Sequence, residues 1–510
     1  MTTPRLNRVL VLSLLLAVSL SCTTQATVSL PASIDVGPDA MPTASRQTGQ
    51  QGRQPKQLPT PQAWLPLIAG SGATEYSLIL GRPTTDAITA SLYAAVDMEI
   101  MLAYGAASGQ LLTQTSVLNL KANAPQNVAL TQLLPDAAYY YRVIANGATS
   151  AEHTFHTQRA SGTSFTFTVD ADPHNRDPNF NGELYVTTLT NARNDHPDFH
   201  INLGDTFMTE KVHPQTITEA ASTFTDMRSY FGIIGADAPL FLVNGNHEGE
   251  LGWLLTSRND KNLPIWSTQL RQLYYPNPAP NSFYSGATAP DATLGAAAVR
   301  DSYFAWTWGD ALFIVLDPFW YTLVKPQPND PNSNWNWTLG RAQYDWLART
   351  LASSTARYKF VFTHHLVGGN GADARGGIEA APFFEWGGKN PDGTYGFDVE
   401  RPGWGKPIHQ LLVENRVNVV FHGHDHVFVK QDLDGIVYQE VPQPSVTMYN
   451  NTSLAEEYGY VNGDVRSSSG HLRVTVTPAQ ATVEYVRAYL IRDENNKQRN
   501  GQIAYSYAIK

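Results

Sequence analysis

The feature that most constrains the fold of this 510-residue chain is a set of five apolar runs, each ending in residues that can bind metal ions. Runs rich in β-branched and aromatic residues favour strands, and continuous apolar strands are typical of sheets buried on both faces. Ligands gather at the carboxyl ends of such strands in layered α/β folds, so we expect the five ends to converge in space. The ends are Asp170-Ala171-Asp172-Pro173-His174, Gly204-Asp205, Asn244-Gly245-Asn246-His247-Glu248, His364-His365 and His422-Gly423-His424-Asp425-His426.

Seven residues at these ends offer carboxylate, imidazole or amide ligands: Asp172, His174, Asp205, Asn246, His364, His424 and His426. The only cysteine is Cys22, near the N-terminus, so a thiolate site is excluded. Seven ligands are too many for one tetrahedral ion, but two ions about 3.5–4 Å apart that share one carboxylate would use them all. Each motif alone is common in turns and helix caps, whereas the ordered set favours a metal centre. Fe, Zn and Mn all accept these ligands, which leaves the identity of the metals open.

The series D-x-H, G-D, G-N-H-E, H and G-H-x-H resembles the calcineurin-like metallophosphoesterase superfamily over roughly residues 164–485. The resemblance implies an α/β fold in which two packed sheets lie between outer helices, a four-layer αββα sandwich. It places Asp172, His174, Asp205 and His426 on one ion, and Asp205 (bridging), Asn246, His364 and His424 on the other. It also implies that His247, beside a ligand, faces the substrate.

The region before these motifs, from Tyr76 to about Thr157, has short alternating apolar runs separated by turns, which predicts an antiparallel β-sandwich. It resembles a fibronectin type III-like module and the N-terminal domain of purple acid phosphatases. Those enzymes carry a tyrosine three places after the bridging aspartate, and its phenolate gives their colour. Here that position is Met208, and His174 stands where they lack a histidine. We therefore expect a colourless protein.

Three further residues near the motifs have more than one interpretation. Asp170 is either a strand-end residue, which we favour, or a group that orients His174. His365 lies next to the predicted ligand His364 and is a candidate for lining the substrate pocket. Arg375, in a glycine-rich loop, is a candidate for binding a phosphate oxygen, although an exposed loop arginine is more often solvated.

The resemblance implies a phosphoesterase that acts on a small phosphorylated substrate. A hydroxide between the two ions would attack phosphorus, and His247 would donate a proton to the leaving oxygen or stabilise its charge. No G-x-S-x-G nucleophile motif occurs. One alternative is a phosphodiesterase or nucleotidase of the same fold, and another is a cell-surface binding protein with structural metals. Seven ligands over two ions leave open positions for water or substrate, which favours catalysis.

The sequence predicts a signal peptide (1–22), a disordered linker (23–62), the β-sandwich (63–160) and the catalytic domain (161–510). Two arginines followed by a twelve-residue apolar run predict export, since the run is too short to span a membrane. Cys22 after that run resembles a bacterial lipoprotein signal and predicts membrane attachment through an acyl group, with ordinary secretion as the alternative. The net charge of −10 argues against a nucleic-acid partner. The alternating runs from residue 437 to 485 are predicted to complete the second sheet.

Overall fold

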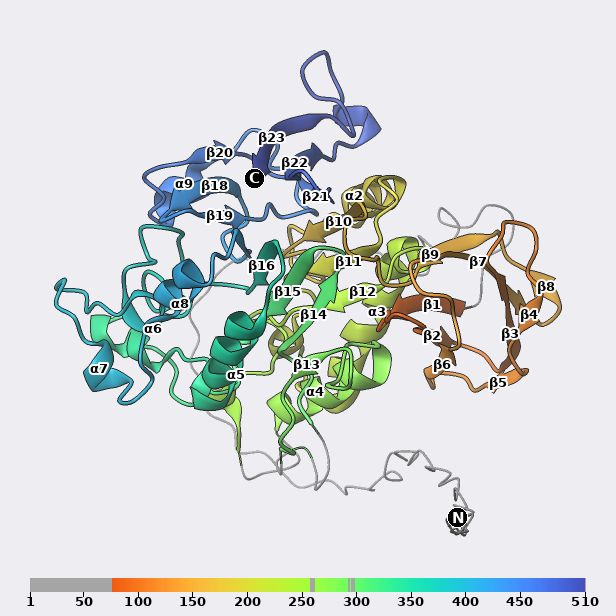
Figure 1. Ribbon diagram of the computed structural model, residues 1–510, viewed down its shortest axis with the longest axis horizontal. Coiled ribbons are helices and arrows are strands. Elements are labelled where there is room, and N and C mark those ends of the chain that lie inside the picture. Colours follow the sequence, from red (N-terminus) through yellow and green to blue (C-terminus); the bar gives the residue numbers. More distant parts are fainter. Residues whose placement is uncertain (1–75, 257–261, 292–293, 295–298, 510) are drawn as a thin grey trace, which may run out of the picture. The chain divides into compact units, whose positions relative to one another are not determined.

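The computed structural model describes residues 76–256, 262–291, 294 and 299–509. The predicted signal peptide, Cys22 and the predicted linker lie outside the described residues. Within them, the chain forms a small all-β part followed by a larger part in which two sheets lie between helices (Figure 1). None of the helices in the described part combines the length and the apolar character that crossing a membrane requires.

The all-β part is a sandwich of two antiparallel sheets that enclose an apolar core including Leu80, Ile100 and Val143. The hydroxyl of Tyr139 accepts a hydrogen bond from the backbone N–H of Leu134 at 2.8 Å. One sheet contains β1 (Tyr76–Gly81), β2 (Ile88–Ala94) and β6 (Gln126–Leu130). The other contains β3 (Met98–Gly105), β4 (Thr113–Gln114), β5 (Leu118–Leu120), β7 (Ala138–Ala145), β8 (Ala148–Thr149) and β9 (His153–His156).

The larger part has two sheets that pack face to face. The first runs in the order β12 (Leu240–Leu242), β11 (Phe199–Asn202), β10 (Phe165–Asp170), β21 (Gly470–Val476), β22 (Ala481–Arg487) and β23 (Ile503–Ile509). The second runs in the order β13 (Ser285–Gly286), β14 (Phe304–Trp308), β15 (Ala311–Val315), β16 (Tyr358–Phe362), β17 (Val419–His422), β19 (Ile436–Glu440), β18 (Phe428–Leu433) and β20 (Asp464–Arg466). Each sheet therefore supplies some of the five predicted strands.

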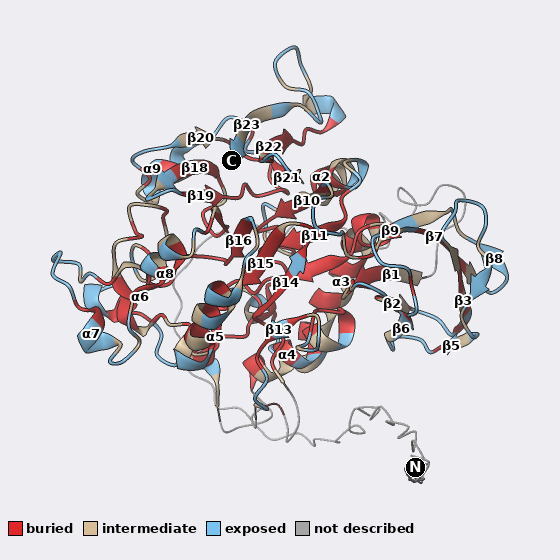
Figure 2. Cartoon of the chain, viewed as in Figure 1, coloured by how far each residue is buried: buried red, intermediate tan, exposed pale blue. Residues whose placement is uncertain are grey.

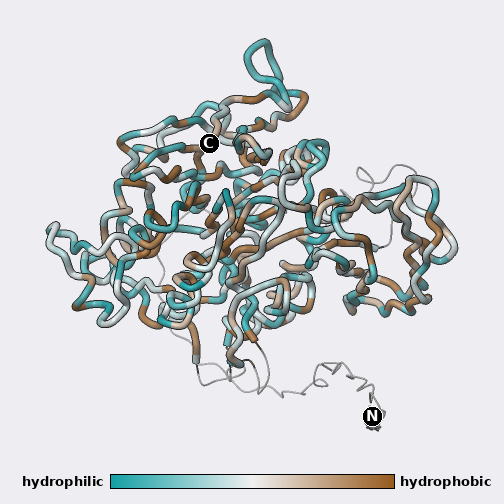
Figure 3. The backbone as a smooth tube through the Cα atoms, viewed as in Figure 1, coloured by the Kyte–Doolittle hydropathy of each residue, from teal (hydrophilic) through white to brown (hydrophobic). Residues whose placement is uncertain are grey.

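The space between the two sheets is filled by phenylalanines from both. Phe167 of β10 meets Phe313 of β15 edge to face at a centroid distance of 5.1 Å, and Phe360 and Phe421 join the same cluster. Burial of these large rings is the main stabilising contribution to a core of this kind. The central strands β10, β11, β15, β16 and β17 are accordingly buried (Figure 2), and the middle of the larger part carries many apolar segments of the chain (Figure 3).

Helices cover the outer face of each sheet and complete four layers. Apolar side chains of α2 (Gly182–Asn194), α3 (Ile217–Gly235) and α4 (Leu263–Tyr274) pack with β12 of the first sheet. Those of α5 (Gly340–Ser353), α6 (Phe384–Gly387) and α8 (Ile408–Glu414) pack on the second sheet. Two short helices, α7 (Phe397–Glu400) and α9 (Ser453–Glu457), lie in connections. The predicted four-layer αββα fold, preceded by a small all-β sandwich, is thus confirmed.

The parallel strands bring the predicted motifs to one edge. β10, β11 and β12 are parallel neighbours in the first sheet, and β16 and β17 are parallel neighbours in the second. Hydrogen bonds then join the loops that follow: the N–H of Asp172 donates to the carbonyl of Gly204 at 3.0 Å, and that of Gly423 donates to the carbonyl of His364 at 2.9 Å. The predicted convergence of the five strand ends is confirmed.

The C-terminal strands differ from the prediction. We expected the runs between residues 437 and 485 to complete the second sheet. β19 does join that sheet, but β21 and β22 join the first. β21 pairs antiparallel with β10, so a late segment of the chain completes the sheet that carries the first motif. Alternation identifies a strand and its buried face, but it does not encode which backbone edge accepts that strand.

Candidate metal centre

The first group of candidate ligands joins the D-x-H and G-H-x-H motifs. One ligand atom from each of Asp172, His174 and His426 lies within 4.8 Å of the others. Nε2 of His174 and Nε2 of His426 lie 3.6 and 3.5 Å from Oδ1 of Asp172. Asp172 is fully buried, whereas the side chain of His426 is 22% exposed. This group therefore sits at the border between the protein interior and solvent.

The second group joins the other three motifs and His424 of the G-H-x-H motif around the ring of His364. Asp205, His364 and His424 form another set of mutually close ligand atoms. Nε2 of His364 lies 3.3 Å from Oδ2 of Asp205 and 3.1 Å from both Oδ1 of Asn246 and Nδ1 of His424. Oδ2 of Asp205 is also 3.4 Å from Nε2 of His174 in the first group. Asp205 thus stands between the two groups, where the resemblance requires the bridging ligand.

The hydrogen bonds of the two closest histidines leave lone pairs that fit a cation. Nδ1 of His364 donates to the carbonyl of Leu203 at 2.8 Å, and Nε2 of His424 donates to the carbonyl of Asp373 at 2.7 Å. In the neutral rings, the opposite nitrogens then carry lone pairs, and these face each other across 3.1 Å. Backbone carbonyls that fix imidazole tautomers in this way are typical of metal-ligating histidines.

Charge and unsatisfied polar atoms also favour a metal site at this position. Oδ1 of Asp172 and Nε2 of His174 are buried without a hydrogen-bond partner. Burial alone would lower the pKa of His174, but Asp172 and Asp205 outweigh it and raise that pKa to about 10. Two buried carboxylates thus create a negative potential that requires compensating positive charge, which metal cations supply when they replace protons.

The backbone turns sharply at five of the candidate ligands. Asp172, His174, Asp205, His424 and His426 all have left-handed conformations, with φ between 53° and 81°. Such conformations cost about 1 kcal/mol or more for residues other than glycine and cluster at functional sites. The turns fold each polar strand end back toward the other loops, which explains how the ligands meet although they follow separate strands.

Gly423 allows the G-H-x-H loop to approach the D-x-H loop. A Cβ at this position would lie 2.5 Å from Oδ2 of Asp172 and 2.8 Å from Cβ of Ala171. The same carboxylate oxygen accepts the N–H of His424 at 2.8 Å, so the two loops are held together at this point. Only glycine fits this approach without displacing a ligand.

We therefore expect Gly423→Ala to reduce metal content and activity together. The added methyl group must move Asp172 or His424, and overpacking of this kind typically costs about 1–3 kcal/mol. Gly232→Ala in α3 is the matched control, because a Cβ there meets no atom closer than 4.0 Å. Elemental analysis beside a phosphatase assay measures both effects, and a Gly423→Ala protein with wild-type metal content would contradict the role of this glycine.

Asp170 forms its side-chain hydrogen bonds with residues that are not candidate ligands. Its carboxylate accepts hydrogen bonds from Nε2 of His200 at 3.1 Å, Nδ2 of Asn202 at 2.8 Å and the hydroxyl of Tyr185 at 3.1 Å. None of these partners is His174. The contacts favour the interpretation of Asp170 as a strand-end residue that joins β10, β11 and α2.

Glu248 is a residue whose role the sequence analysis missed. Its buried carboxylate accepts hydrogen bonds from the backbone N–H groups of Gly245 at 2.5 Å, Asp205 at 2.9 Å and Thr206 at 2.6 Å. It therefore ties the loop of Asp205 to the loop of Asn246. The letters G-N-H-E contained this residue, but its partners in the G-D loop become visible only in three dimensions.

His247 forms a third set of mutually close ligand atoms with His174 and Asp205, and it reaches solvent. Its backbone N–H donates to Oδ1 of Asp205 at 2.8 Å, and Nε2 of its ring lies 3.8 Å from Oδ2 of the same residue. The side chain is 18% exposed, and Nδ1 contacts the carboxylate of Glu210. The ring is thus held at the edge of the centre, where the resemblance expects a substrate-facing histidine.

The two predicted substrate-binding residues lie in different surroundings. His365 is buried, and its ring contacts Trp337 and Phe319 at centroid distances of 4.6 and 5.0 Å. Arg375 is 24% exposed, pairs with Asp425 at 3.2 Å and donates to the backbone carbonyl of His424. The substrate-binding roles of both residues stay predictions.

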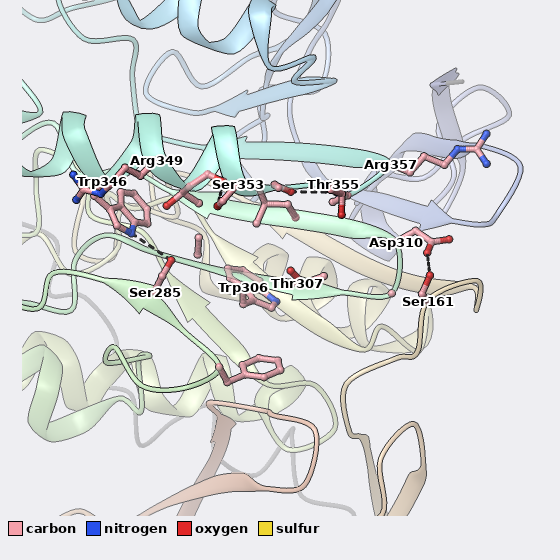
Figure 4. A pocket seen from close by; sticks show the side chains of 17 residues that line it. Ser161, Ser285, Trp306, Thr307, Asp310, Trp346, Arg349, Ser353, Thr355 and Arg357 are labelled. Carbon is pink, nitrogen blue, oxygen red and sulfur yellow. Dashed lines mark hydrogen bonds between the residues drawn. The ribbon is translucent and has the colours of Figure 1, made fainter. Parts of the chain in front are cut away.

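One cavity of the described part lies away from this centre. It has a volume of about 760 Å³ and lies between β14, β15 and the end of α5 (Figure 4). Its lining includes Trp346, Arg349 and Arg357, and Arg357 directly precedes the first residue of β16. The cavity therefore lies at the opposite end of β16 from His364, and none of the candidate ligands lines it.

Comparison with known proteins agrees with this geometry. The family model described as calcineurin-like phosphoesterase matches residues 165–428. The chain belongs to this family. The matched region begins at β10 and ends in β18, so it contains all five motifs of the calcineurin-like phosphoesterase site. A comparison with curated proteins finds no match.

Two solved structures share the fold at low sequence identity. A structure of PhoD is 15% identical, with 86% of this chain and 91% of PhoD covered and a TM-score of 0.61. Purple acid phosphatase PPD1 from seeds of yellow lupin (Lupinus luteus) is 16% identical, with 84% of this chain and 73% of PPD1 covered and a TM-score of 0.54. Both structural alignments cover more of this calcineurin-like phosphoesterase than residues 165–428, which the family model matches.

Proposed function

We propose that this calcineurin-like phosphoesterase is a dinuclear metal-dependent phosphatase that hydrolyses esters of small phosphorylated substrates. The observation that carries the proposal is the position of Asp205 between two groups of ligands whose histidine lone pairs converge. Two bound cations would lower the pKa of water toward about 7 and neutralise charge on phosphoryl oxygens. Fe, Zn and Mn all suit the nitrogen and oxygen ligands present.

The residues of this chain would perform the remaining steps. Asp172, His174 and His426 would hold one ion, Asn246, His364 and His424 the other, and Asp205 both. The ring of His247, which is partly exposed beside Asp205, would donate a proton to the leaving oxygen or stabilise its charge. A covalent intermediate is not required, because water supplies the attacking oxygen.

Export and lipid attachment form part of the proposal. The basic and apolar N-terminal segment supports a signal peptide, and Cys22 supports acylation at the membrane surface. Export would place the enzyme where extracellular phosphate esters are its substrates. Labelling with a radioactive or clickable fatty acid, compared between wild type and Cys22→Ser, tests the anchor.

A substrate panel tests the reaction. We expect hydrolysis of p-nitrophenyl phosphate to exceed that of bis(p-nitrophenyl) phosphate, to stop when a chelator removes the metals, and to return when metal is restored. Faster hydrolysis of the bis-ester would favour the phosphodiesterase alternative. Metal binding without hydrolysis of any phosphoester would favour a binding protein with structural metals.

The purified protein is expected to be colourless. Met208 occupies the position of the tyrosine that colours purple acid phosphatases, and its buried thioether cannot supply a phenolate. Absorption spectroscopy of the metal-loaded protein checks this expectation. An intense phenolate band in the visible range would contradict it, and the Met208→Tyr variant loaded with iron provides the positive control.

A further inference from the structure

The cavity between β14, β15 and the end of α5 carries polar groups that the candidate metal centre does not use. We propose that this cavity binds an acidic carbohydrate chain, that is, a chain of sugars with carboxylate or sulfate groups. The cavity lies at the opposite end of β16 from His364, so the inference does not depend on the proposed phosphatase function. Its volume of about 760 Å³ lies within the range of about 300–1,000 Å³ that is usual for ligand pockets.

The charge of the lining favours an anion. Of the described residues that line the cavity, Arg349 and Arg357 are basic and Asp310 alone is acidic. Oδ1 of Asp310 already accepts hydrogen bonds from the hydroxyl of Ser161 at 2.5 Å and from the N–H of Gly162 at 3.0 Å. The cavity thus keeps a positive charge in a chain whose net charge is −10, and an anionic ligand would be attracted to it.

Neither arginine is paired with a carboxylate of the described part. Arg357 donates to the backbone carbonyls of Pro478 and Ala479, which fixes its guanidinium group without neutralising it. The exposed guanidinium group of Arg349 has no hydrogen-bond or ion-pair partner among the described residues. A guanidinium group presents five N–H donors in a planar fork, which matches the paired oxygens of a carboxylate or sulfate group. Both side chains are therefore available to acidic groups of a ligand.

The positions of the two arginines favour an elongated ligand. Figure 4 shows Arg349 and Arg357 at opposite ends of the row of side chains that line the cavity. One small anion would contact only one of them. A ligand that engages both must be an extended chain with acidic groups that are separated along its length.

Hydroxyl groups lie between the two arginines and fit the hydroxyls of sugars. Figure 4 shows Ser285, Thr307, Ser353 and Thr355 along this part of the cavity. The hydroxyl of Ser285 accepts a hydrogen bond from Nε1 of Trp346 at 3.3 Å, which leaves its own proton for a ligand oxygen. The hydroxyls of Thr307 and Thr355 have no hydrogen-bond partner among the described residues. Each of these groups can both donate and accept, as sugar hydroxyls do.

An acidic peptide is the alternative extended ligand, but the backbone at the cavity does not favour it. A peptide of this kind would bind by adding a strand to the outer edge of β14. That edge is already in use, because β13 pairs with Phe304 and Ala305, and the carbonyl of Thr307 accepts a hydrogen bond from Nε2 of Gln158 at 2.8 Å. The cavity therefore offers side-chain hydroxyls and guanidinium groups rather than a free strand edge.

Calorimetric titration of the full-length protein with an oligogalacturonate and with a dextran sulfate oligosaccharide tests the inference. We expect at least one of these acidic chains to bind, and the stronger of the two identifies the acidic group. Arg349→Gln and Arg357→Gln should each weaken this binding about fivefold, the upper range for an exposed ion pair. The double variant should weaken it about 25-fold, because arginines at opposite ends contact separate groups of one chain and their effects multiply.

Arg341→Gln is the matched control. Arg341 lies on the same helix, pairs with Asp345 at 2.7 Å and is not among the described residues that line the cavity, so its replacement should leave binding unchanged. Hydrolysis of p-nitrophenyl phosphate should equal that of wild type in all these variants. Absence of hydrolysis by the wild-type protein would overturn the proposed function and leave this inference standing.

Three results would overturn the inference. The first is that neither acidic chain binds, or that a neutral maltooligosaccharide binds as tightly. The second is an unchanged affinity in both arginine variants, which would place the binding elsewhere on the protein. The third is tighter binding of poly-L-glutamate than of either acidic carbohydrate, which would identify an acidic peptide as the ligand.

Discussion

Replacement of Asp205 by asparagine or alanine is expected to remove both bound metal and activity. Oδ2 of Asp205 lies 3.4 Å from Nε2 of His174 and 3.3 Å from Nε2 of His364, so this residue is shared by the two ligand groups. Loss of a shared carboxylate would weaken the binding of both ions at once. The fall in kcat should exceed the ~10²–10³-fold that loss of a single electrostatic contact typically costs.

Elemental analysis of the purified variant beside a p-nitrophenyl phosphate assay measures this effect. Asp392→Asn is the control, because its exposed carboxylate contacts only its own loop through Thr394. Wild-type metal content in Asp205→Ala would show that the ions do not share this residue. Wild-type turnover would remove the basis of the proposed reaction.

Replacement of His247 is expected to have the second large effect on activity, but without a loss of metal. His247→Asn should lower kcat by about 10²–10⁴-fold, the usual contribution of a general acid, while metal content stays near that of wild type. The reason for the difference is structural. The hydrogen bond from residue 247 to Oδ1 of Asp205 comes from the backbone, so the substitution leaves it in place and removes only the ring.

Assays of His247→Asn beside a control variant of another histidine separate a catalytic role from a general loss of stability. His196→Asn is a suitable control, since His196 is exposed, has a positive φ of 49° that asparagine tolerates, and lies outside the ligand groups. Loss of metal from His247→Asn would identify the ring as a ligand. Unchanged kcat would exclude it from the reaction.

Much of the site was accessible from sequence because the ligands are strand-end residues of recognisable type. Asp172, Asp205 and His364 each follow a buried apolar strand, and parallel strands place their carboxyl ends together. The αββα fold came from the family resemblance. That resemblance also distinguished Met208 from the tyrosine of purple acid phosphatases.

Contacts between distant segments were not accessible in this way. Glu248 belongs to the G-N-H-E motif, but its role arises from hydrogen bonds with backbone N–H groups of the G-D loop. The carbonyl of Asp373 that fixes the tautomer of His424 leaves no trace in the sequence, because every residue has a carbonyl. Arg375 was noticed as a loop arginine, whereas its pairing with Asp425 depends on how that loop folds.

The sequence by itself determined which residues end the buried strands and which metal chemistry those residues permit, since hydrophobic patterning and ligand type are local properties. The tertiary structure decided which of these candidate ligands lie close together, which ring nitrogens of His364 and His424 face each other, and which sheet receives β21 and β22. The physical reason is that hydrogen-bond direction and distances of a few ångströms depend on the packing of segments far apart in the chain, which no local pattern records.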